Sequence, residues 1–173
     1  HLYHPNPRLA LSKLAAAFYT RQPAHIAAVT GTDGKTSTAE FTRQLWELLG
    51  FKAASIGTLG IKGEGGKELY PGTHTTPDPV TLHRILQELA DSGYTHVVME
   101  ASSHGLDQYR LHGVRLQAAA FTNLTRDHMD YHGTEEAYFA AKAKLFSEIL
   151  PEGGTAVINA VDHYSSVLCN IAK

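Results

Sequence analysis

The apolar residues of this chain fall into short continuous runs that alternate with longer segments of helical periodicity. The short runs predict buried strands over residues 25–29, 53–56, 95–99, 116–122 and 155–158. The helical spacing predicts helices over residues 9–18, 35–49, 78–92, 135–149 and from 163 onward. Strands that alternate with helices in this way predict an α/β fold, a three-layer domain in which helices flank a mainly parallel sheet.

Two of the predicted helices carry an apolar face that we expect to point toward the sheet. In the helix over 35–49 this face consists of Ala39, Phe41, Leu45, Trp46, Leu48 and Leu49. In the helix over 78–92 it consists of Val80, Leu82, Ile85, Leu86 and Leu89. Between these helices, residues 57–72 contain six glycines and alternate polar with apolar positions, which predicts a hairpin or a mobile loop.

The composition is that of an ordinary folded domain. The chain has 173 residues, enough for one domain with a buried core. Its hydrophobic content of 43%, charged content of 18% and formal net charge of -2 exclude a disordered tail and do not indicate a nucleic-acid-binding surface. The apolar stretch over 9–19 is interrupted by Ser12 and Lys13 and is too short to span a bilayer, so we expect no membrane segment.

The cysteine content indicates the cellular compartment, and the first residue indicates whether the sequence is part of a longer protein. The single cysteine, Cys169, cannot form an internal disulfide and favours a reducing compartment, so we expect a cytoplasmic protein. The sequence begins at His1 rather than Met, and we therefore expect a fragment of a longer protein.

A glycine turn joins the first predicted strand to the next helix, in the sequence VTGTDGKTS over residues 29–37. Such a turn gathers unpaired backbone N–H groups at the positive end of a helix dipole, which favours phosphate, and Lys35 adds a full positive charge. The Thr36 hydroxyl stands where P-loop enzymes bind magnesium, so the turn predicts a P-loop-type domain that binds a nucleoside triphosphate. The general G-x-x-x-x-G-K-[ST] pattern is incomplete, because Val29 occupies its first glycine position.

Two further polar segments also follow predicted strands, MEASSHGLDQYR from Met99 and FTNLTRDHMDYHG from Phe121. Ligands of open parallel sheets bind at the carboxyl ends of the strands, so we expect these segments to lie beside the glycine turn. Glu100 in that position favours a metal ligand over a structural carboxylate. A zinc site at His128 and His132 is disfavoured, because the pair lacks the glutamate of an H-E-x-x-H motif and no cysteine is nearby.

Together with HTTPDP from His74 and AYFAAKAKLF from Ala137, these segments resemble the central ATPase domain of the Mur ligases, most closely the MurE branch. The resemblance runs from about Arg8 to Asn159, and the short phosphate loop is the family's own form. It implies that residues 1–173 are the central ATP-binding domain, without the N-terminal domain that binds UDP and the C-terminal domain that binds the amino acid.

MurE enzymes add the third residue of the peptidoglycan stem peptide to UDP-N-acetylmuramoyl-L-alanyl-D-glutamate through an acyl phosphate. The resemblance implies this ATP-dependent amide ligase activity, with meso-diaminopimelate favoured over L-lysine, in a bacterial cytoplasmic monomer. Two alternatives stay open. The chain could belong to another Mur ligase or a folylpolyglutamate-type ligase, or it could be a nucleotide-binding module without ligase activity.

The resemblance also assigns roles to individual residues. ATP would be held by Gly31, Thr32, Asp33, Gly34, Lys35, Thr36, Ser37 and Asn123. Two magnesium ions would be held by Thr36, Glu100, His128 and a carbamylated Lys142. The catalytic residues would be Lys35, His128 and Lys142. The muramoyl dipeptide would be held by Thr75, Thr76, Ser102, Gln108 and Arg110.

Three residues carry particular expectations. Carbon dioxide adds only to a neutral amine, so burial or nearby cations must lower the pKa of Lys142. Asp33 stands where the family more often has asparagine, which places an extra negative charge beside phosphate. Val161 stands where an aspartate is usual, and we expect the loss of that acid to have a modest effect.

Overall fold

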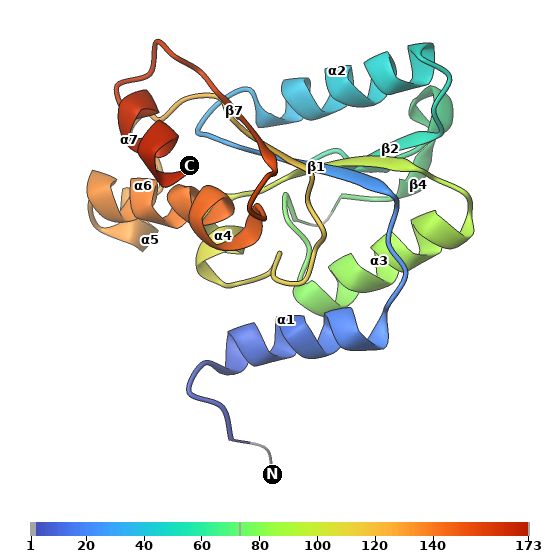
Figure 1. The fold of residues 1–173 in the computed structure, drawn as a ribbon, viewed down its shortest axis with the longest axis horizontal. Helices are drawn as coiled ribbons and strands as arrows, with labels where there is room; N and C mark the ends of the chain where they lie inside the picture. Colours follow the sequence, from blue (N-terminus) through green and yellow to red (C-terminus); the bar gives the residue numbers. More distant parts are fainter. Residues whose placement is uncertain (1–2, 73, 173) are drawn as a thin grey trace.

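A seven-stranded sheet runs through the middle of the computed structural model, which describes residues 3–72 and 74–172 (Figure 1). The strands are β1 (His25–Thr30), β2 (Ala53–Gly57), β3 (Gly60–Lys62), β4 (Glu68–Tyr70), β5 (His96–Glu100), β6 (Ala118–Phe121) and β7 (Thr155–Ile158). Their order across the sheet is β4-β3-β2-β5-β1-β6-β7. The five strands β2, β5, β1, β6 and β7 pair in parallel, and β3 and β4 extend the sheet as an antiparallel hairpin.

Helices cover both faces of this sheet. They are α1 (Pro7–Phe18), α2 (Lys35–Leu48), α3 (Pro79–Asp91), α4 (Ser103–Asp107), α5 (Met129–His132), α6 (Glu135–Lys144) and α7 (Ser165–Ile171). A 3-10 turn spans Glu64–Gly66, and a π-helical turn, Leu145–Ile149, continues α6. The predicted α/β fold with a mainly parallel sheet flanked by helices is confirmed, and the glycine-rich segment over 57–72 forms the hairpin rather than the loop.

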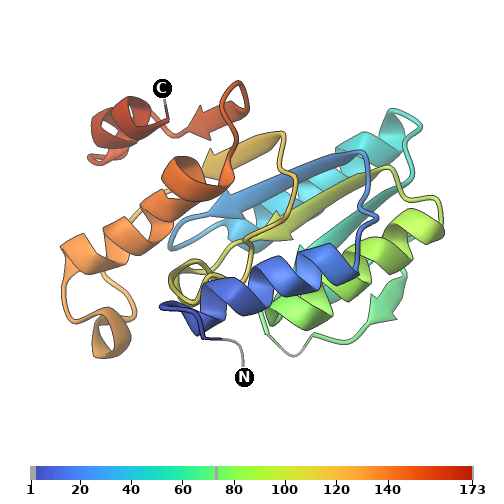
Figure 2. The ribbon, with the colours of Figure 1, turned by 60° about the horizontal axis from the view of Figure 1, so that its bottom comes forward.

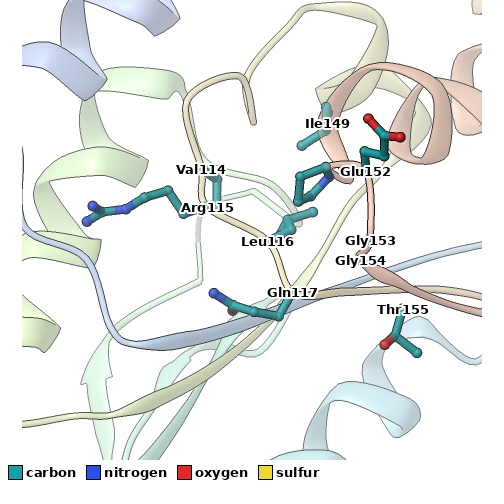
Figure 3. Close-up of a pocket in the computed structure, with 10 residues that line it drawn as sticks. Val114, Arg115, Leu116, Gln117, Ile149, Glu152, Gly153, Gly154 and Thr155 are labelled. Atoms are coloured by element: carbon teal, nitrogen blue, oxygen red, sulfur yellow. The ribbon is translucent and has the colours of Figure 1, made fainter.

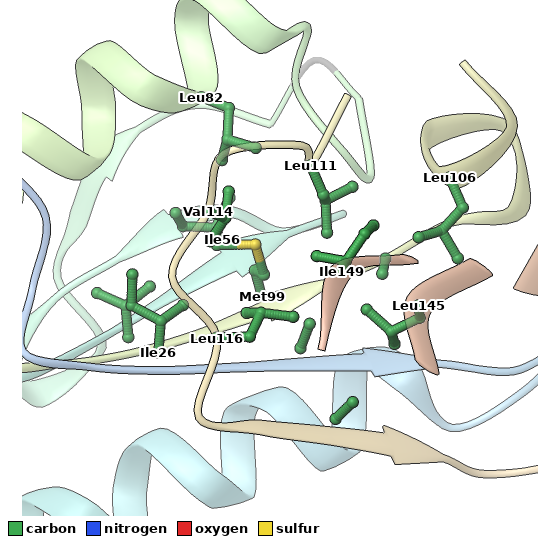
Figure 4. Close-up of a cluster of buried hydrophobic side chains, with 14 of the residues drawn as sticks. Ile26, Ile56, Leu82, Met99, Leu106, Leu111, Val114, Leu116, Leu145 and Ile149 are labelled. Carbon is green, nitrogen blue, oxygen red and sulfur yellow. The ribbon is translucent and has the colours of Figure 1, made fainter. Parts of the chain in front are cut away.

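The larger part of the core lies on the face covered by α3, α4 and α6, and α1 packs beside α3 on the same side (Figure 2). Figure 4 shows branched side chains from the sheet, such as Ile26 and Ile56, meeting Leu82, Leu106 and Leu145 from the helices. Alternate strand residues reach the other face, where Val29 and Val98 pack against Ala39 of α2. Both faces of the central strands are therefore buried, as a parallel sheet requires.

The predicted inward face of α2 is wrong in most of its positions. Phe41, Leu45, Leu48 and Leu49 are exposed, with 83% of Leu48 accessible to solvent. The residues that face the sheet are instead Ala39, Arg43 and the partly buried Trp46. The helix has two apolar stripes on opposite sides, and periodicity alone does not distinguish them.

Arg43 explains which stripe points inward. Its guanidinium is buried, and it donates to Glu47 at 2.7 Å, to Glu40 at 3.1 Å and to the Gly63 carbonyl in the hairpin at 3.2 Å. These three acceptors compensate for the loss of water around the charge. A polar residue therefore occupies the centre of the buried stripe and connects α2 to the hairpin.

The inward face of α3 is predicted correctly except at Val80, which lies in the first turn and is 40% exposed. His83 is buried in the same helix, where its Nε2 lies 3.0 Å from the His112 carbonyl oxygen. The helix begins at Asp78, whose side chain accepts from the N–H groups of Val80 and Thr81. Pro79 follows at the first helical position, where no N–H is needed.

No helix within the described ranges combines the length and the apolar composition needed to span a bilayer. The short helices α4 and α5 were not predicted, because each is less than two turns long and lies inside a segment dominated by polar residues. Ser102 caps α4 by accepting from the Gly105 N–H.

The orientation of α2 can be tested by comparing Arg43→Met with Leu48→Ala. The Arg43 change removes the cation that pairs with two partly buried carboxylates and donates to a buried carbonyl, so we expect the free energy of unfolding to fall by about 2–4 kcal/mol. The Leu48 change removes an exposed side chain and should alter it by no more than ~0.5 kcal/mol. Urea unfolding followed by circular dichroism measures both. An equal loss in the two variants would contradict the observed orientation.

Candidate functional site

The polar segments predicted to carry chemistry follow three adjacent strands at the centre of the sheet. β1 lies between β5 and β6, with Val29 opposite Glu100 and Thr30 opposite Phe121. The glycine turn after β1 is therefore flanked by Glu100 on one side and by the 122–123 segment on the other. This is the carboxyl edge of the parallel strands, where ligands of such sheets bind.

The glycine turn is held against the end of β6. The N–H of Thr32 donates to the Asn123 carbonyl and the N–H of Asp33 to the Asn123 side chain, both at 2.9 Å. Gly31 has a φ of +148°, and a Cβ there would lie 1.9 Å from the Thr122 hydroxyl oxygen. Gly34 begins α2 in the left-handed conformation. Both positions require glycine because of their backbone angles, and Gly31 also because of its neighbour.

Lys35 curls back over this turn. Its Nζ donates to the carbonyls of Gly31 at 3.0 Å and Thr32 at 2.8 Å. Burial lowers the pKa of Lys35, while three nearby carboxylates act in the opposite direction, those of Glu100, Asp33 and Asp127. The ammonium group therefore stands at the mouth of the turn, beside the start of α2, where the helix dipole is positive.

Glu100 is a buried carboxylate that has no ion pair among the described residues. The Thr36 hydroxyl donates to it at 2.9–3.0 Å, and Thr58 donates its N–H at 2.9 Å and its hydroxyl at 3.3 Å. Gly57 makes room for it, since a Cβ there would lie 2.0 Å from Glu100 Oε1. A buried anion and a hydroxyl oxygen together form a donor set that suits a hard divalent cation such as magnesium.

Lys142 of α6 reaches the same turn from the other side. It is 1% exposed, its Nζ donates to the Gly31 carbonyl at 2.7 Å, and it lies 4.3 Å from the centre of the Tyr138 ring. Burial and then the charge of Lys35 lower the pKa of Lys142 to about 7. A substantial fraction of this amine is thus neutral near pH 7, as the sequence-based expectation for carbamylation required.

The residues predicted to hold the muramoyl dipeptide form one hydrogen-bonded group. Thr76 donates its hydroxyl to the Glu100 carbonyl at 2.9 Å and lies 3.0 Å from the Ser102 hydroxyl. Arg110 donates to the Thr76 carbonyl at 2.6 Å and to the Gln108 side chain at 2.8 Å. Thr75 contacts the group through Thr58, with 3.0 Å between the two hydroxyl oxygens.

Two predicted residues stand apart from these contacts. His128 has a φ of 53° at the start of α5, and its Nε2 lies 3.4 Å from the Asp127 carboxylate and its ring 4.9 Å from that of His104. None of its described contacts reaches Thr36 or Glu100. Ser37 is exposed in the first turn of α2. Among the described residues, no three histidine, cysteine, aspartate or glutamate side chains are arranged as a metal-binding group.

Asp33 and Val161, the two residues that depart from the family pattern, both lie at the surface. Asp33 is exposed, and its negative charge acts on Lys35 and Lys142. Val161 is 91% exposed, so its side chain takes no part in the site. The neighbouring Asp162 accepts from the backbone of Leu124 at 2.8 Å and supports the segment after β6.

Sequence reasoning missed Thr58 and Tyr138. Thr58 follows β2, and the rule that polar residues at strand ends form the site would have selected it had it been applied to that strand. Tyr138 is buried, and its hydroxyl oxygen lies 3.2 Å from the Thr32 hydroxyl oxygen. Its ring packs against the Lys142 amine. In the sequence it resembles any core aromatic residue of a helix.

A separate cavity of about 610 Å³ lies where β6 and β7 begin, at the opposite edge of the sheet. Figure 3 shows it between Leu116, Gln117 and the turn that contains Glu152. None of the predicted site residues lines it. Its position at the amino ends of the strands separates it from the chemistry described above.

The amino-acid sequence of the chain is similar to those of known ligases. The chain is 58% identical over 168 residues to a UDP-N-acetylmuramoyl-L-alanyl-D-glutamate--2,6-diaminopimelate ligase of Bradyrhizobium diazoefficiens, covering 97% of the chain and 34% of that relative. It is 60% identical over 161 residues to the protein of the same name from Rhizobium meliloti, covering 93% and 33%. The chain thus spans about a third of the length of these curated relatives.

Solved structures give the same fold. The structure of a UDP-N-acetylmuramoyl-L-alanyl-D-glutamate--2,6-diaminopimelate ligase matches with a TM-score of 0.83 at 34% identity, over 99% of the chain and 34% of that structure. Escherichia coli FolC in complex with DHPP and ADP matches with a TM-score of 0.73 at 16% identity, over 99% and 45%, a likeness of fold alone. Residues 29–173 match the Mur ligase middle domain. The chain therefore belongs to the Mur ligase family.

Proposed function

We propose that this chain is the central, ATP-binding domain of an ATP-dependent amide ligase that adds 2,6-diaminopimelate to UDP-N-acetylmuramoyl-L-alanyl-D-glutamate in peptidoglycan synthesis. The observation that carries the proposal is the convergence of Lys35 and Lys142 on one carbonyl of the glycine turn, with the buried Glu100 across the turn. Relatives named for this reaction are 58% and 60% identical to the chain. The domains that bind UDP and the amino acid would lie elsewhere in the longer protein.

ATP would bind along the glycine turn, with its phosphates at the N–H groups that begin α2 and with Lys35 beside them. The residues that would hold it are Gly31, Thr32, Asp33, Gly34, Lys35, Thr36, Ser37 and Asn123. Thr36 and Glu100 supply oxygen ligands for one magnesium ion, while His128 and a carbamylated Lys142 would serve a second. Bound magnesium would neutralise phosphate charge and so favour attack by an anionic nucleophile.

Carbamylation would reverse the charge of Lys142. Carbon dioxide bonds to the neutral amine, one proton leaves, and a carbamate anion replaces a cation next to the phosphate loop. The buried position and the low pKa of Lys142 support this step, because they keep part of the amine unprotonated.

The reaction would proceed in two displacements. The side-chain carboxylate of the D-glutamate attacks the γ-phosphorus of ATP, ADP leaves, and an acyl phosphate forms. An amine of diaminopimelate then attacks the acyl carbon, phosphate leaves, and the amine loses a proton to give the amide. Lys35 offsets charge on the transferring group, and Arg110 with Thr76 and Ser102 would orient the acceptor.

The acyl phosphate must be shielded from water, which the open edge of this domain does not provide alone. We therefore expect the chain by itself to bind nucleotide weakly and to ligate poorly. The enzyme would act in the bacterial cytoplasm, where its nucleotide substrates occur, and as a monomer. A folylpolyglutamate-type ligase is the second candidate, supported only by its shared fold.

The decisive test is ATP hydrolysis by the full-length protein, with and without the muramoyl dipeptide and with diaminopimelate or lysine. We expect phosphate release only when the dipeptide and diaminopimelate are both present, with no release from the Lys35→Ala variant. Phosphate release that does not depend on either substrate would favour a nucleotide-binding module. So would the absence of phosphate release from a folded protein that binds ATP.

Lys142 should make the stability of the chain depend on pH. Above pH 7 the folded amine loses its proton while the unfolded one, with a pKa near 10.5, keeps it, so the free energy of unfolding should rise with pH. Comparing urea unfolding of the wild type and Lys142→Met at pH 7 and pH 9, in buffers free of carbon dioxide, isolates this contribution. Parallel pH profiles for the two proteins would refute it.

The hydroxyl of Thr58 should contribute to activity. A substitution at this position tests the hydroxyl alone, because the backbone N–H contact with Glu100 is kept. In the full-length protein we expect Thr58→Val to lower kcat/KM for the dipeptide by about tenfold, and Thr58→Ser to restore it. Steady-state phosphate release measures both variants. Full activity of the valine variant would show that the backbone contact suffices.

A further inference from the structure

A small cavity of about 150 Å³ adjoins the residues proposed to hold the muramoyl dipeptide. Gln108 and Arg110 line one side of it, Asp78 and Pro79 from the start of α3 another, and Arg8 and Leu11 of α1 complete it. Figure 2 shows the start of α1 beside α4 and the chain that follows it. The Ser12 hydroxyl donates to the Tyr109 carbonyl and so fixes α1 against that segment.

Arg8 has no bonding partner in this cavity. It is exposed, and within residues 3–72 and 74–172 its guanidinium makes no hydrogen bond or ion pair. Asp78 lines the same cavity and yet does not pair with it. An arginine side chain that lines a cavity with all five of its donors available is suited to an anionic ligand.

The other charged groups of the cavity are held in place by hydrogen bonds, and Arg110 uses three of its five N–H donors in them. Arg110 donates from Nε and Nη2 to Gln108 and from Nη1 to the Thr76 carbonyl, so its plane is fixed. Asp78 accepts from the backbone of Val80 and Thr81. Burial raises the pKa of Asp78, but these hydrogen bonds and the charge of Arg110 outweigh it and the pKa is lowered.

The cavity therefore has two guanidinium groups against one carboxylate that is committed to capping α3. This excess of positive charge favours an anion such as a planar carboxylate or a tetrahedral phosphate, to which two arginines can donate together. The acceptor named in the proposed function carries both kinds of anion, the carboxylates of its dipeptide and the pyrophosphate of its nucleotide. ATP is not the candidate, since none of the residues predicted to hold it lines the cavity.

We propose that Arg8 is a further substrate-binding residue, which holds an anionic carboxylate or phosphate group of the acceptor together with Arg110. The inference rests on the proposed function for the identity of the acceptor. It assigns α1 a role in substrate binding in addition to its packing against α3. The effect should appear in KM for the acceptor and leave kcat nearly unchanged, because the cavity that Arg8 lines includes neither the glycine turn nor Lys142.

The experiment compares Arg8→Gln with Lys13→Gln in the full-length protein. Lys13 is an exposed cation on the same helix that does not line the cavity, so it controls for the loss of surface charge. We expect Arg8→Gln to raise the KM and the Kd for the acceptor by about tenfold, Arg8→Lys to restore part of the loss, and Lys13→Gln to have no effect. Circular dichroism confirms that each variant folds.

A second acceptor compound identifies which anionic group Arg8 contacts. N-acetylmuramoyl-L-alanyl-D-glutamate lacks the nucleotide and its pyrophosphate. A loss in Arg8→Gln that persists with this compound assigns the contact to a carboxylate, and a loss that disappears assigns it to the pyrophosphate. Equal KM and Kd values for the Arg8→Gln, Lys13→Gln and wild-type proteins would overturn the proposal.

Calorimetric binding separates this inference from the proposed function. If the wild type binds the acceptor but does not ligate it, the ligase function fails while the Kd of Arg8→Gln still decides the role of Arg8. If the wild type does not bind the acceptor, both proposals are overturned.

Discussion

The contact between Gly31 and the end of β6 is the constraint on which the site depends. Only a residue without a side chain lets the turn lie against Thr122, where a Cβ would come within 1.9 Å of the hydroxyl oxygen. The same residue presents its carbonyl to two lysines, Lys35 from α2 and Lys142 from α6. One glycine therefore sets the path of the turn and brings together two lysines that are more than a hundred residues apart along the chain.

Two ammonium groups near one carbonyl oxygen repel each other, which lowers the pKa of the more buried one. Lys142 is the more deeply buried of the two and has the pKa near 7, so it is the one that loses its proton readily. Lys35 is less deeply buried, and Glu100 raises its pKa in addition to Asp33 and Asp127, which act on both lysines. The two lysines are thus chemically distinct, one suited to holding phosphate and the other to reaction with carbon dioxide.

Sequence patterns predicted most of this fold because strands, glycine turns and helix caps leave local signals. They failed on the inward face of α2, where Arg43 occupies a buried position that only its partners Glu40, Glu47 and Gly63 make tolerable. They located the polar strand ends, but they gave no hydrogen-bond partners. The roles of Thr58 and Tyr138 depend on the neighbours that the fold brings to them, and no local pattern carries that information.

Glu100 joins the glycine turn to the residues that we propose hold the acceptor. Its side chain accepts from the Thr36 hydroxyl of α2, while its backbone carbonyl accepts from the Thr76 hydroxyl. Thr58 gives a second connection, since its hydroxyl lies within bonding distance of both the Glu100 carboxylate and the Thr75 hydroxyl. A shift of the Glu100 carboxylate would therefore act on Thr75 through Thr58, and a shift of the Glu100 backbone would act directly on Thr76. The end of a single strand thus connects the glycine turn, where we propose that ATP binds, to the residues that we propose hold the acceptor.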